Sequence, residues 1–259
     1  MDRRERGSAR HGARRTPPSR ADAPRRSAAT LALAVLLIAA GVGAIGYPFA
    51  MQALYRAGAE QAVARYDAEY GGAGPGGASA SGRDLDRLLA DLRAYNERIF
   101  AEGQDGLRDP FSYEQPAIDL AGYGFDEDMI GYLEVPKMDL LVPVYLGASP
   151  ENMARGAALL GETSVPIGGP DTNAVIAGHR GMSTAAMFRD VQLLEPGDRV
   201  YVTNPFGELA YEVAEIEIID PSDRDAVLIQ PGRDLVTLVT CHPPPYNYQR
   251  YLVRCERVQ

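Results

Sequence analysis

Near its end the chain reads Leu235-Val-Thr-Leu-Val-Thr-Cys241, an apolar run rich in β-branched residues. Such a run is typical of a buried strand. A second run, Asn173-Ala-Val-Ile-Ala-Gly-His179, has the same texture and ends at a histidine. Arg250 follows Cys241 by nine residues and begins a third strand-like run. The end of a strand can hold a side chain firmly while it still faces a cleft, so these three positions are candidates for chemistry.

The surrounding sequence, from about residue 117, has the same β texture. Short strand-like runs alternate with turns rich in Gly, Pro and Asp, which favours a closed or nearly closed barrel. We expect strands at 129–135, 140–146, 174–177, 199–202, 209–219, 235–240 and 251–258. We expect short helices at 150–160 and 185–194. The fold class is therefore mainly β.

The N-terminal part of the chain has the pattern of a membrane anchor. No charged residue occurs from Ser27 to Tyr55, and residues 31–51 are long and apolar enough to cross a bilayer as a helix. Residues 1–30 carry nine Arg and a charge balance of +6, whereas the rest of the chain has a balance of −15. The positive-inside rule then predicts a basic cytoplasmic tail at 1–30 and an extracytoplasmic remainder. A cleaved signal peptide is the alternative, but the apolar run exceeds a usual signal-peptide core.

A helical stalk is predicted between the anchor and the β domain, over residues 52–107. Its first helix is Ala-rich, and its second begins after Asp84, a good N-cap residue. The second helix has one apolar stripe, formed by Leu85, Leu88, Leu89, Leu92, Tyr95 and Ile99. Residues 71–82 between the helices have the Gly/Ala/Ser composition of a flexible linker. A short irregular segment at 108–116 then leads into the β domain at 117–259.

Composition excludes several function classes. The acidic folded part is unsuited to nucleic acid, which requires phosphate-neutralising surface. Two Cys are too few for a disulfide scaffold or a four-thiolate zinc site. The sequence contains no cluster of His and Cys that would hold zinc, so we expect neither a metal nor an organic cofactor.

A thiol, an imidazole and a guanidinium are the groups needed for acyl transfer. The thiolate attacks a carbonyl, the imidazole moves protons, and the guanidinium stabilises the oxyanion. The residues alone leave other interpretations open. Cys241 could be a small buried hydrophobe or form a disulfide with Cys255. His242 is an alternative imidazole. Arg254 shares a strand face with Arg250, so alternation does not separate the two.

Two motifs resemble those of the sortases. Leu238-Val-Thr-Cys241 followed by Arg250 is similar to the sortase T-L-x-T-C…R signature, and Thr172–Gly181 resembles the segment that holds the sortase histidine. The matching parts run colinearly from Ile130 to Arg254. The resemblance implies a closed eight-stranded sortase-like β-barrel with short helices, preceded by the stalk and the transmembrane helix.

The resemblance also implies roles for individual residues. Cys241 would be the nucleophile, His179 the proton-transfer group and Arg250 the oxyanion-binding group, in preference to His242 and Arg254. Thr240, within the signature, would contact substrate.

A further motif resembles class C sortases, which polymerise pilins. Asp109-Pro110-Phe111 is similar to the Asp-Pro-aromatic lid of that class. By resemblance, Asp109 would pair with Arg250 and Phe111 would cover Cys241. Three features depart from the class pattern. The chain stops at Gln259 without a second hydrophobic segment, His242-Pro-Pro-Pro-Tyr246 replaces a common Thr-Pro-Tyr, and Cys255 stands where Gly is usual.

The resemblance implies a single-pass, membrane-anchored cysteine transpeptidase with a monomeric extracytoplasmic catalytic domain. Its partners would be secreted pilin or surface proteins with an LPxTG-like sorting signal, cleaved between Thr and Gly. A pilin lysine would then accept the acyl group in an isopeptide bond. Alternatives are a housekeeping sortase that attaches proteins to peptidoglycan, a non-catalytic membrane-tethered binding barrel, and a cysteine peptidase that releases its acyl group to water.

Overall fold

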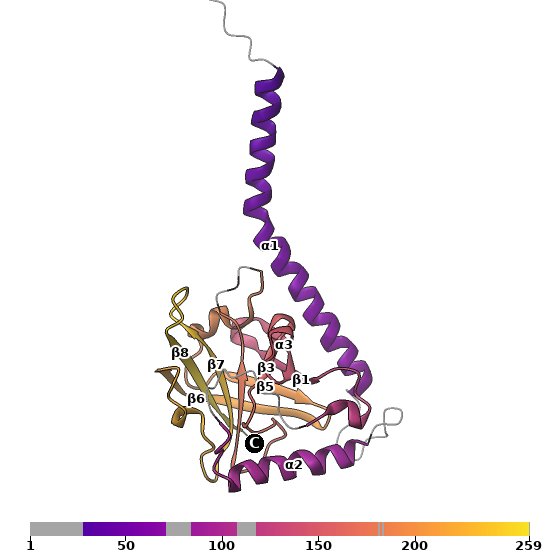
Figure 1. Cartoon of the computed structure of the whole chain (residues 1–259), viewed down its shortest axis with the longest axis vertical. Coiled ribbons are helices and arrows are strands. Elements are labelled where there is room, and N and C mark those ends of the chain that lie inside the picture. Colours follow the sequence, from indigo (N-terminus) through magenta and orange to yellow (C-terminus); the bar gives the residue numbers. More distant parts are fainter. Residues whose placement is uncertain (1–27, 71–83, 108–117, 181, 183, 259) are drawn as a thin grey trace, which may run out of the picture. The chain divides into compact units, whose positions relative to one another are not determined.

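The computed structural model of the chain describes residues 28–70, 84–107, 118–180, 182 and 184–258 (Figure 1). The chain divides into two compact units, Met1–Ile45 and Gly46–Gln259. The predicted linker at 71–82 and the predicted lid residues Asp109, Pro110 and Phe111 lie outside the described residues.

Helix α1 spans Ala28–Tyr70 and continues through Pro48. By length and composition it is a candidate membrane span, and its N-terminal part contains the predicted anchor at 31–51. Helical structure over 52–70 is confirmed. Near the end of the helix Val63, Tyr66 and Tyr70 are buried, and the Tyr66 hydroxyl donates to the Ile130 carbonyl at 2.7 Å. The last turns of α1 are therefore bonded to the first strand.

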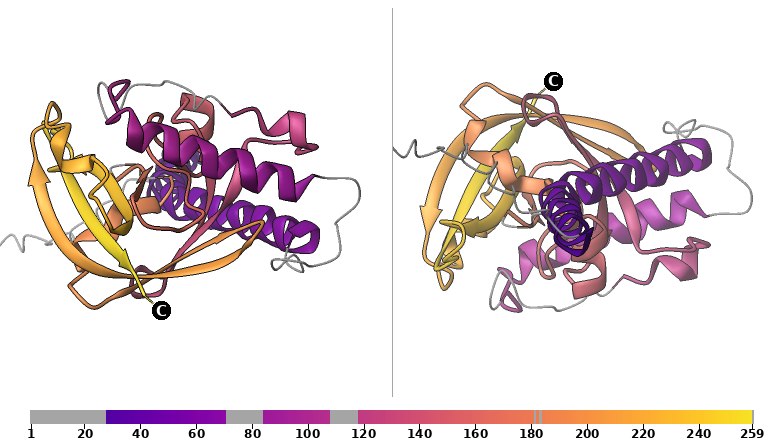
Figure 2. Two further views of the ribbon diagram at one scale, coloured as in Figure 1. Left: turned by 90° about the horizontal axis from the view of Figure 1, so that it is seen from below. Right: turned by 90° about the horizontal axis from the view of Figure 1, so that it is seen from above.

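Helix α2 spans Leu85–Ala101, with Asp84 as the predicted cap. The Asp84 carboxylate accepts a hydrogen bond from the Arg87 N–H at 3.1 Å, which satisfies one of the free donors of the first turn. The apolar stripe predicted for this helix faces inward, and Leu88, Leu92 and Ile99 are fully buried. In Figure 2, α2 and the last turns of α1 lie along the same side of the strands.

Eight strands close into a barrel in the order β1-β2-β3-β4-β7-β8-β6-β5. Their bounds are β1 Met129–Val135, β2 Leu140–Leu146, β3 Ala157–Leu159, β4 Thr172–Ala177, β5 Arg199–Asn204, β6 Gly207–Ile219, β7 Asp234–His242 and β8 Gln249–Arg257. The pairs β2–β3 and β4–β7 are parallel, and the other pairs are antiparallel. Closure leaves no free edge in the sheet that the described strands form. The prediction of a closed eight-stranded barrel is confirmed.

Short helical segments fill the connections. They are η1 Leu120–Tyr123, η2 Pro136–Met138, α3 Pro150–Arg155, η3 Met187–Leu193 and η4 Asp225–Val227. The prediction of one helix over 150–160 was wrong in its second half, because the chain leaves the helix at Gly156 and forms β3. The expected helix at 185–194 is the 3₁₀ segment η3.

Two apolar clusters lie on the two faces of the strands that carry the candidate site. The inner cluster fills the barrel and includes Ile176, Leu238 and Val253. The outer cluster includes Ala177, Val239 and Leu252, the neighbours of those residues in sequence. Side chains along a strand alternate between faces, so these clusters define an inner and an outer face for β4, β7 and β8.

Candidate active site

Cys241 and Arg250 are directly opposite each other across β7 and β8. They are Cα partners in the antiparallel register. The pair Val239↔Leu252 lies two positions away along the same two strands. Val239 and Leu252 belong to the outer cluster, so alternation places Cys241 and Arg250 on the outer face as well. The Cβ atoms of such partners lie about 4.5–5.5 Å apart. The strand register therefore brings the predicted thiol and guanidinium together.

His179 lies at the end of the strand on the other side of β7. Ala177 pairs with Val239 in the parallel β4–β7 register, and the Gly178 N–H donates to the Val239 carbonyl at 3.1 Å. Two residues beyond each member of that pair are His179 and Cys241, on strands that are about 4.8 Å apart. The barrel order β4-β7-β8 thus puts Cys241 on the central strand, with His179 on one side and Arg250 on the other.

The surroundings tune the imidazole and hold the guanidinium. His179 is half-buried, and loss of solvent lowers its pKa below the usual 6.5, which favours the neutral form near pH 7. Arg250 Nη1 donates to the carbonyls of Asn247 and Gln249 at 2.9 and 3.0 Å. The guanidinium is therefore tied to the β7–β8 loop beside Cys241.

A glycine and a phenylalanine position His179. The Phe188 N–H donates to the His179 carbonyl at 3.0 Å, which ties η3 to the histidine. A Cβ at Gly178 would lie 2.8 Å from the Phe188 ring, closer than real Cβ contacts. Gly178 is visible in the sequence beside the histidine, but its close approach to Phe188 depends on tertiary structure.

Thr240 lies on the inner face and is fully buried. Its hydroxyl donates to the Gly178 carbonyl at 2.6 Å, which links β7 to the residue before His179. The structure gives Thr240 a contact within the protein, so we interpret it as a residue that positions the end of β4. Its expected contact with substrate stays a prediction.

The alternative imidazole and guanidinium have other partners. His242 lies on the inner face, and its Nδ1 is 2.8 Å from Arg180 Nη1. Arg254 is buried, pairs with Glu215 and Glu217, and donates to the Ala226 carbonyl at 2.9 Å. These contacts give His242 and Arg254 structural partners away from the thiol of Cys241.

The two cysteines are free, so the structure does not contain the alternative Cys241–Cys255 disulfide. Cys255 belongs to the inner cluster, on the opposite face of the sheet from Cys241. Burial raises the pKa of Cys255 far above that of an ordinary thiol. Cys241 is partly exposed, as a nucleophile must be.

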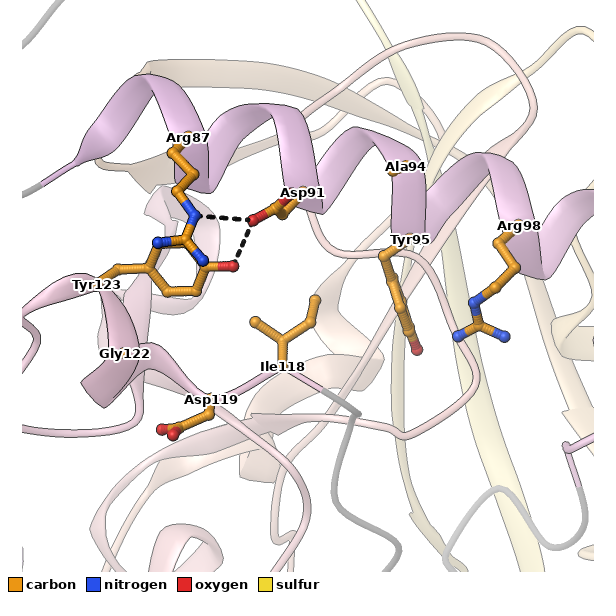
Figure 3. A pocket seen from close by; sticks show the side chains of 9 residues that line it. All are labelled: Arg87, Asp91, Ala94, Tyr95, Arg98, Ile118, Asp119, Gly122 and Tyr123. Carbon is orange, nitrogen blue, oxygen red and sulfur yellow. Dashed lines mark hydrogen bonds and ion pairs between the residues drawn. The ribbon is translucent and has the colours of Figure 1, made fainter.

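A hollow of about 480 Å³ lies between α2 and η1 (Figure 3). Asp91 accepts from the Tyr123 hydroxyl at 2.6 Å and pairs with Arg87 at 3.7 Å, while Arg87 stacks over the Tyr123 ring. None of the three predicted catalytic residues lines this hollow. Arg98, which also lines the hollow, pairs with Glu102 at 2.7 Å.

Comparisons with known proteins identify the family of the chain. A model of the sortase domain matches residues 133–258. Sortase A of Bacillus anthracis is 30% identical over 165 residues, which cover 63% of this chain and 77% of that protein.

Solved structures of sortases C resemble the fold as well. Sortase C1 of the group B Streptococcus pilus island 1 has 35% identity and a TM-score of 0.61, covering 68% of this chain and 83% of that one. A lid mutant of Streptococcus agalactiae sortase C1 has 34% identity and a TM-score of 0.60, covering 68% of this chain and 89% of that one. The chain belongs to the sortase family of cysteine transpeptidases, and these solved relatives are class C enzymes.

Proposed function

We propose that the chain is a membrane-anchored transpeptidase that cleaves an LPxTG-like sorting signal between Thr and Gly and joins pilin subunits by an isopeptide bond. The observation that carries the proposal is that Cys241 on β7 lies opposite Arg250 on β8 and next to the end of β4, two residues before His179. The pilus-related name of one solved relative favours a pilin as substrate.

The geometry suits a two-step acyl transfer. Neutral His179 takes the proton of the Cys241 thiol, the resulting thiolate attacks the Thr carbonyl, and Arg250, on the same face as Cys241, stabilises the oxyanion. His179 protonates the leaving Gly amine, and the acyl group stays on sulfur as a thioester. In the second step His179 accepts a proton from the lysine amine, which attacks the thioester and releases Cys241.

We also propose the location of the reaction. The basic residues 1–30 precede the apolar part of α1, so the positive-inside rule places the barrel outside the cell. The substrates would then be secreted proteins, which reach the barrel after export.

The test uses the full chain in detergent with an LPxTG-containing peptide and a second peptide that presents a lysine side chain. We expect a product joined from Thr to Nε of lysine, identified by fragment mass spectrometry, and no product with Cys241→Ala. Absence of Thr–Gly cleavage in the wild type would overturn the proposal.

The same assay separates the alternative of a housekeeping sortase, which attaches proteins to peptidoglycan. Supplying a lysine side chain and a peptidoglycan-type amine together makes the two acceptors compete. We expect the lysine product to dominate. Dominance of the other product would assign the chain to cell-wall attachment, and release of free acid alone would identify a peptidase.

We further propose that Asp109-Pro110-Phe111 forms a lid over the site. The motif resembles that of class C enzymes, and one solved relative is named as a lid mutant. Phe111→Ala should raise the rate at which iodoacetamide labels Cys241 by about tenfold, since removing a ring that covers a thiol increases its access. Phe100→Ala, at an exposed phenylalanine of α2, is the matched control. Equal labelling rates in the wild type and Phe111→Ala would show that the segment is only a connection.

A further inference from the structure

Each predicted catalytic residue is followed directly by a residue of one inner-face cluster. Arg180 follows His179, His242 follows Cys241, and Tyr251 follows Arg250. Alternation turns His242 and Tyr251 away from the outer face, and Arg180, which lies beyond the end of β4, contacts both of them there. Their contacts show that the three side chains meet one another there.

Arg180 is the centre of the cluster. Its Nη1 lies 2.8 Å from Nδ1 of His242, and its guanidinium stacks over the Tyr251 ring at 5.1 Å from the centroid. The rings of His242 and Tyr251 are 5.6 Å apart between centroids. Arg180 is 8% exposed, so these contacts form with little competition from water.

The cluster also reaches the segment that holds His179. Arg180 Nη2 donates to Oε1 of Gln192 on η3, and η3 donates the Phe188 N–H to the His179 carbonyl. One guanidinium therefore contacts the strand end of Cys241, the strand start of Arg250 and the helix beside His179.

The hydrogen bond defines the state of His242. A guanidinium has donors only, so Nδ1 of His242 must accept, and the ring must be neutral with its proton on Nε2. Loss of solvent and the charge of Arg180 both lower the pKa of His242. The groups that face this pair are Tyr251 from β8 and Asp190 from η3, whose charge acts on Arg180. Protonation of His242 removes the acceptor and places two cations together.

We propose that Arg180, His242 and Tyr251 form a positioning cluster that sets the spacing of His179, Cys241 and Arg250 and releases it when His242 is protonated. The proposal rests on the catalytic assignment given above. It makes the three residues positioning residues, because none of them lies on the face where the thiol attacks.

The test compares four variants of the full chain in detergent. Arg180→Met removes the donor, and His242→Phe keeps a ring against Tyr251 but removes the acceptor. His242→Asn places an amide oxygen close to the position of Nδ1 and does not titrate. Arg199→Met, at an exposed arginine paired with Glu212 on β5 and β6, is the control.

Two readouts are measured from pH 5 to pH 9: kcat and KM for the peptide, and the rate of Cys241 alkylation by iodoacetamide. We expect Arg180→Met and His242→Phe to lower kcat about tenfold, with KM changed less than twofold. That fold-change corresponds to the loss of roughly one charged hydrogen bond. His242→Asn should stay within threefold of wild type near pH 8 and lose a smaller fraction of its kcat toward acidic pH than wild type does, since His179 titrates in both.

Unchanged kcat in both Arg180→Met and His242→Phe would overturn the proposal. An equal loss in His242→Asn and His242→Phe would also overturn it, because that result would indicate simple packing. Circular dichroism checks the fold of every variant, and the two His242 variants decide the question if Arg180→Met does not fold. A wild type without peptide turnover would refute the proposed function instead. The alkylation rates of Cys241 would then still report whether the cluster positions the thiol.

Discussion

The β7–β8 ribbon carries a cysteine and an arginine at each of its two ends, and the two ends differ. At one end Cys241 is partly exposed opposite Arg250, whose guanidinium donates to carbonyls of the adjoining loop. At the other end Cys255 is fully buried, and Arg254 is held by Glu215 and Glu217. The two ends carry the same residue types, but the burial of the cysteines and the partners of the arginines differ.

The difference shows what a reactive thiol requires. Cys255 points into the barrel, where burial raises its pKa and suppresses the thiolate. Cys241 is on the outer face, next to strand β4, which ends two residues before His179. Carboxylates of β6 neutralise Arg254, which therefore links β6 to β8. A guanidinium neutralised in this way is a poor group for stabilising an oxyanion. The face of the strand thus separates the two cysteines, and carboxylate partners separate the two arginines.

The largest expected effect on activity comes from replacing the two cysteines with alanine, one at a time. Cys241→Ala should abolish transpeptidation, because no other thiol lies on the outer face of the ribbon. Cys255→Ala should leave kcat/KM nearly unchanged and destabilise the fold by about 1 kcal/mol, since it leaves a small cavity. Peptide turnover and thermal unfolding measure the two effects. Residual turnover in Cys241→Ala would refute the assignment of the nucleophile.

The two arginines provide the second contrast. Arg250→Met should lower kcat/KM about 100- to 1,000-fold, as expected for loss of an oxyanion donor. Arg254→Met should instead lower stability by about 2 kcal/mol, because it removes charged hydrogen bonds to Glu215 and Glu217. Kinetics and denaturant unfolding of both variants separate the roles. The reverse pattern would show that Arg254 serves the reaction.

A substitution at Gly178 tests whether the position of His179 depends on the close contact between Gly178 and Phe188. In Gly178→Ala the new Cβ meets the Phe188 ring, so η3 or the His179 segment must move. We expect kcat to fall about tenfold, since small misplacement of a catalytic group is costly. Gly122→Ala on η1 is the control, because a Cβ there meets nothing within 4 Å. Equal kcat in both variants would mean that His179 does not depend on this contact.

The smallest effect concerns the titration of His179. Its pKa is lowered by burial, so between that pKa and the usual 6.5 the unfolded chain binds more protons than the folded chain. Stability should therefore fall as pH decreases through 6.5. NMR titration of the ring protons, with His242→Asn to assign the signals, should give a His179 midpoint below 6.5. A midpoint at or above 6.5 would contradict the burial of the imidazole.

Much of the fold follows from local patterns in the sequence. The bounds of β1 and β2 agree with the predicted ones, because turn residues stop each apolar run at Pro136 and Gly147. The N-cap at Asp84 and the apolar stripe of α2 were also predicted from the sequence. Strand β3 was missed because Ala157, Ala158 and Leu159 are good helix formers, and only pairing with β2 and β4 makes them a strand.

The candidate site could be predicted only in part. The strand ends at His179, Cys241 and Arg250 are visible in the sequence, and the family resemblance selects among the alternatives. The inner-face contact of Arg180 with His242 was not predictable, because it joins residues that are 62 positions apart. The buried hydrogen bond of Thr240 likewise depends on the parallel β4–β7 pairing.

That parallel pairing has a consequence for the order of folding events. The Thr240 hydroxyl and the Gly178 carbonyl are also 62 residues apart, so His179 reaches Cys241 only after a long loop has closed. Pairing between distant strands is slow compared with hairpin formation. Until its barrel closes, the chain therefore lacks the arrangement of His179, Cys241 and Arg250 proposed for catalysis. The proposed chemistry therefore depends on the finished fold, because only the closed barrel brings Cys241 next to its proposed partners.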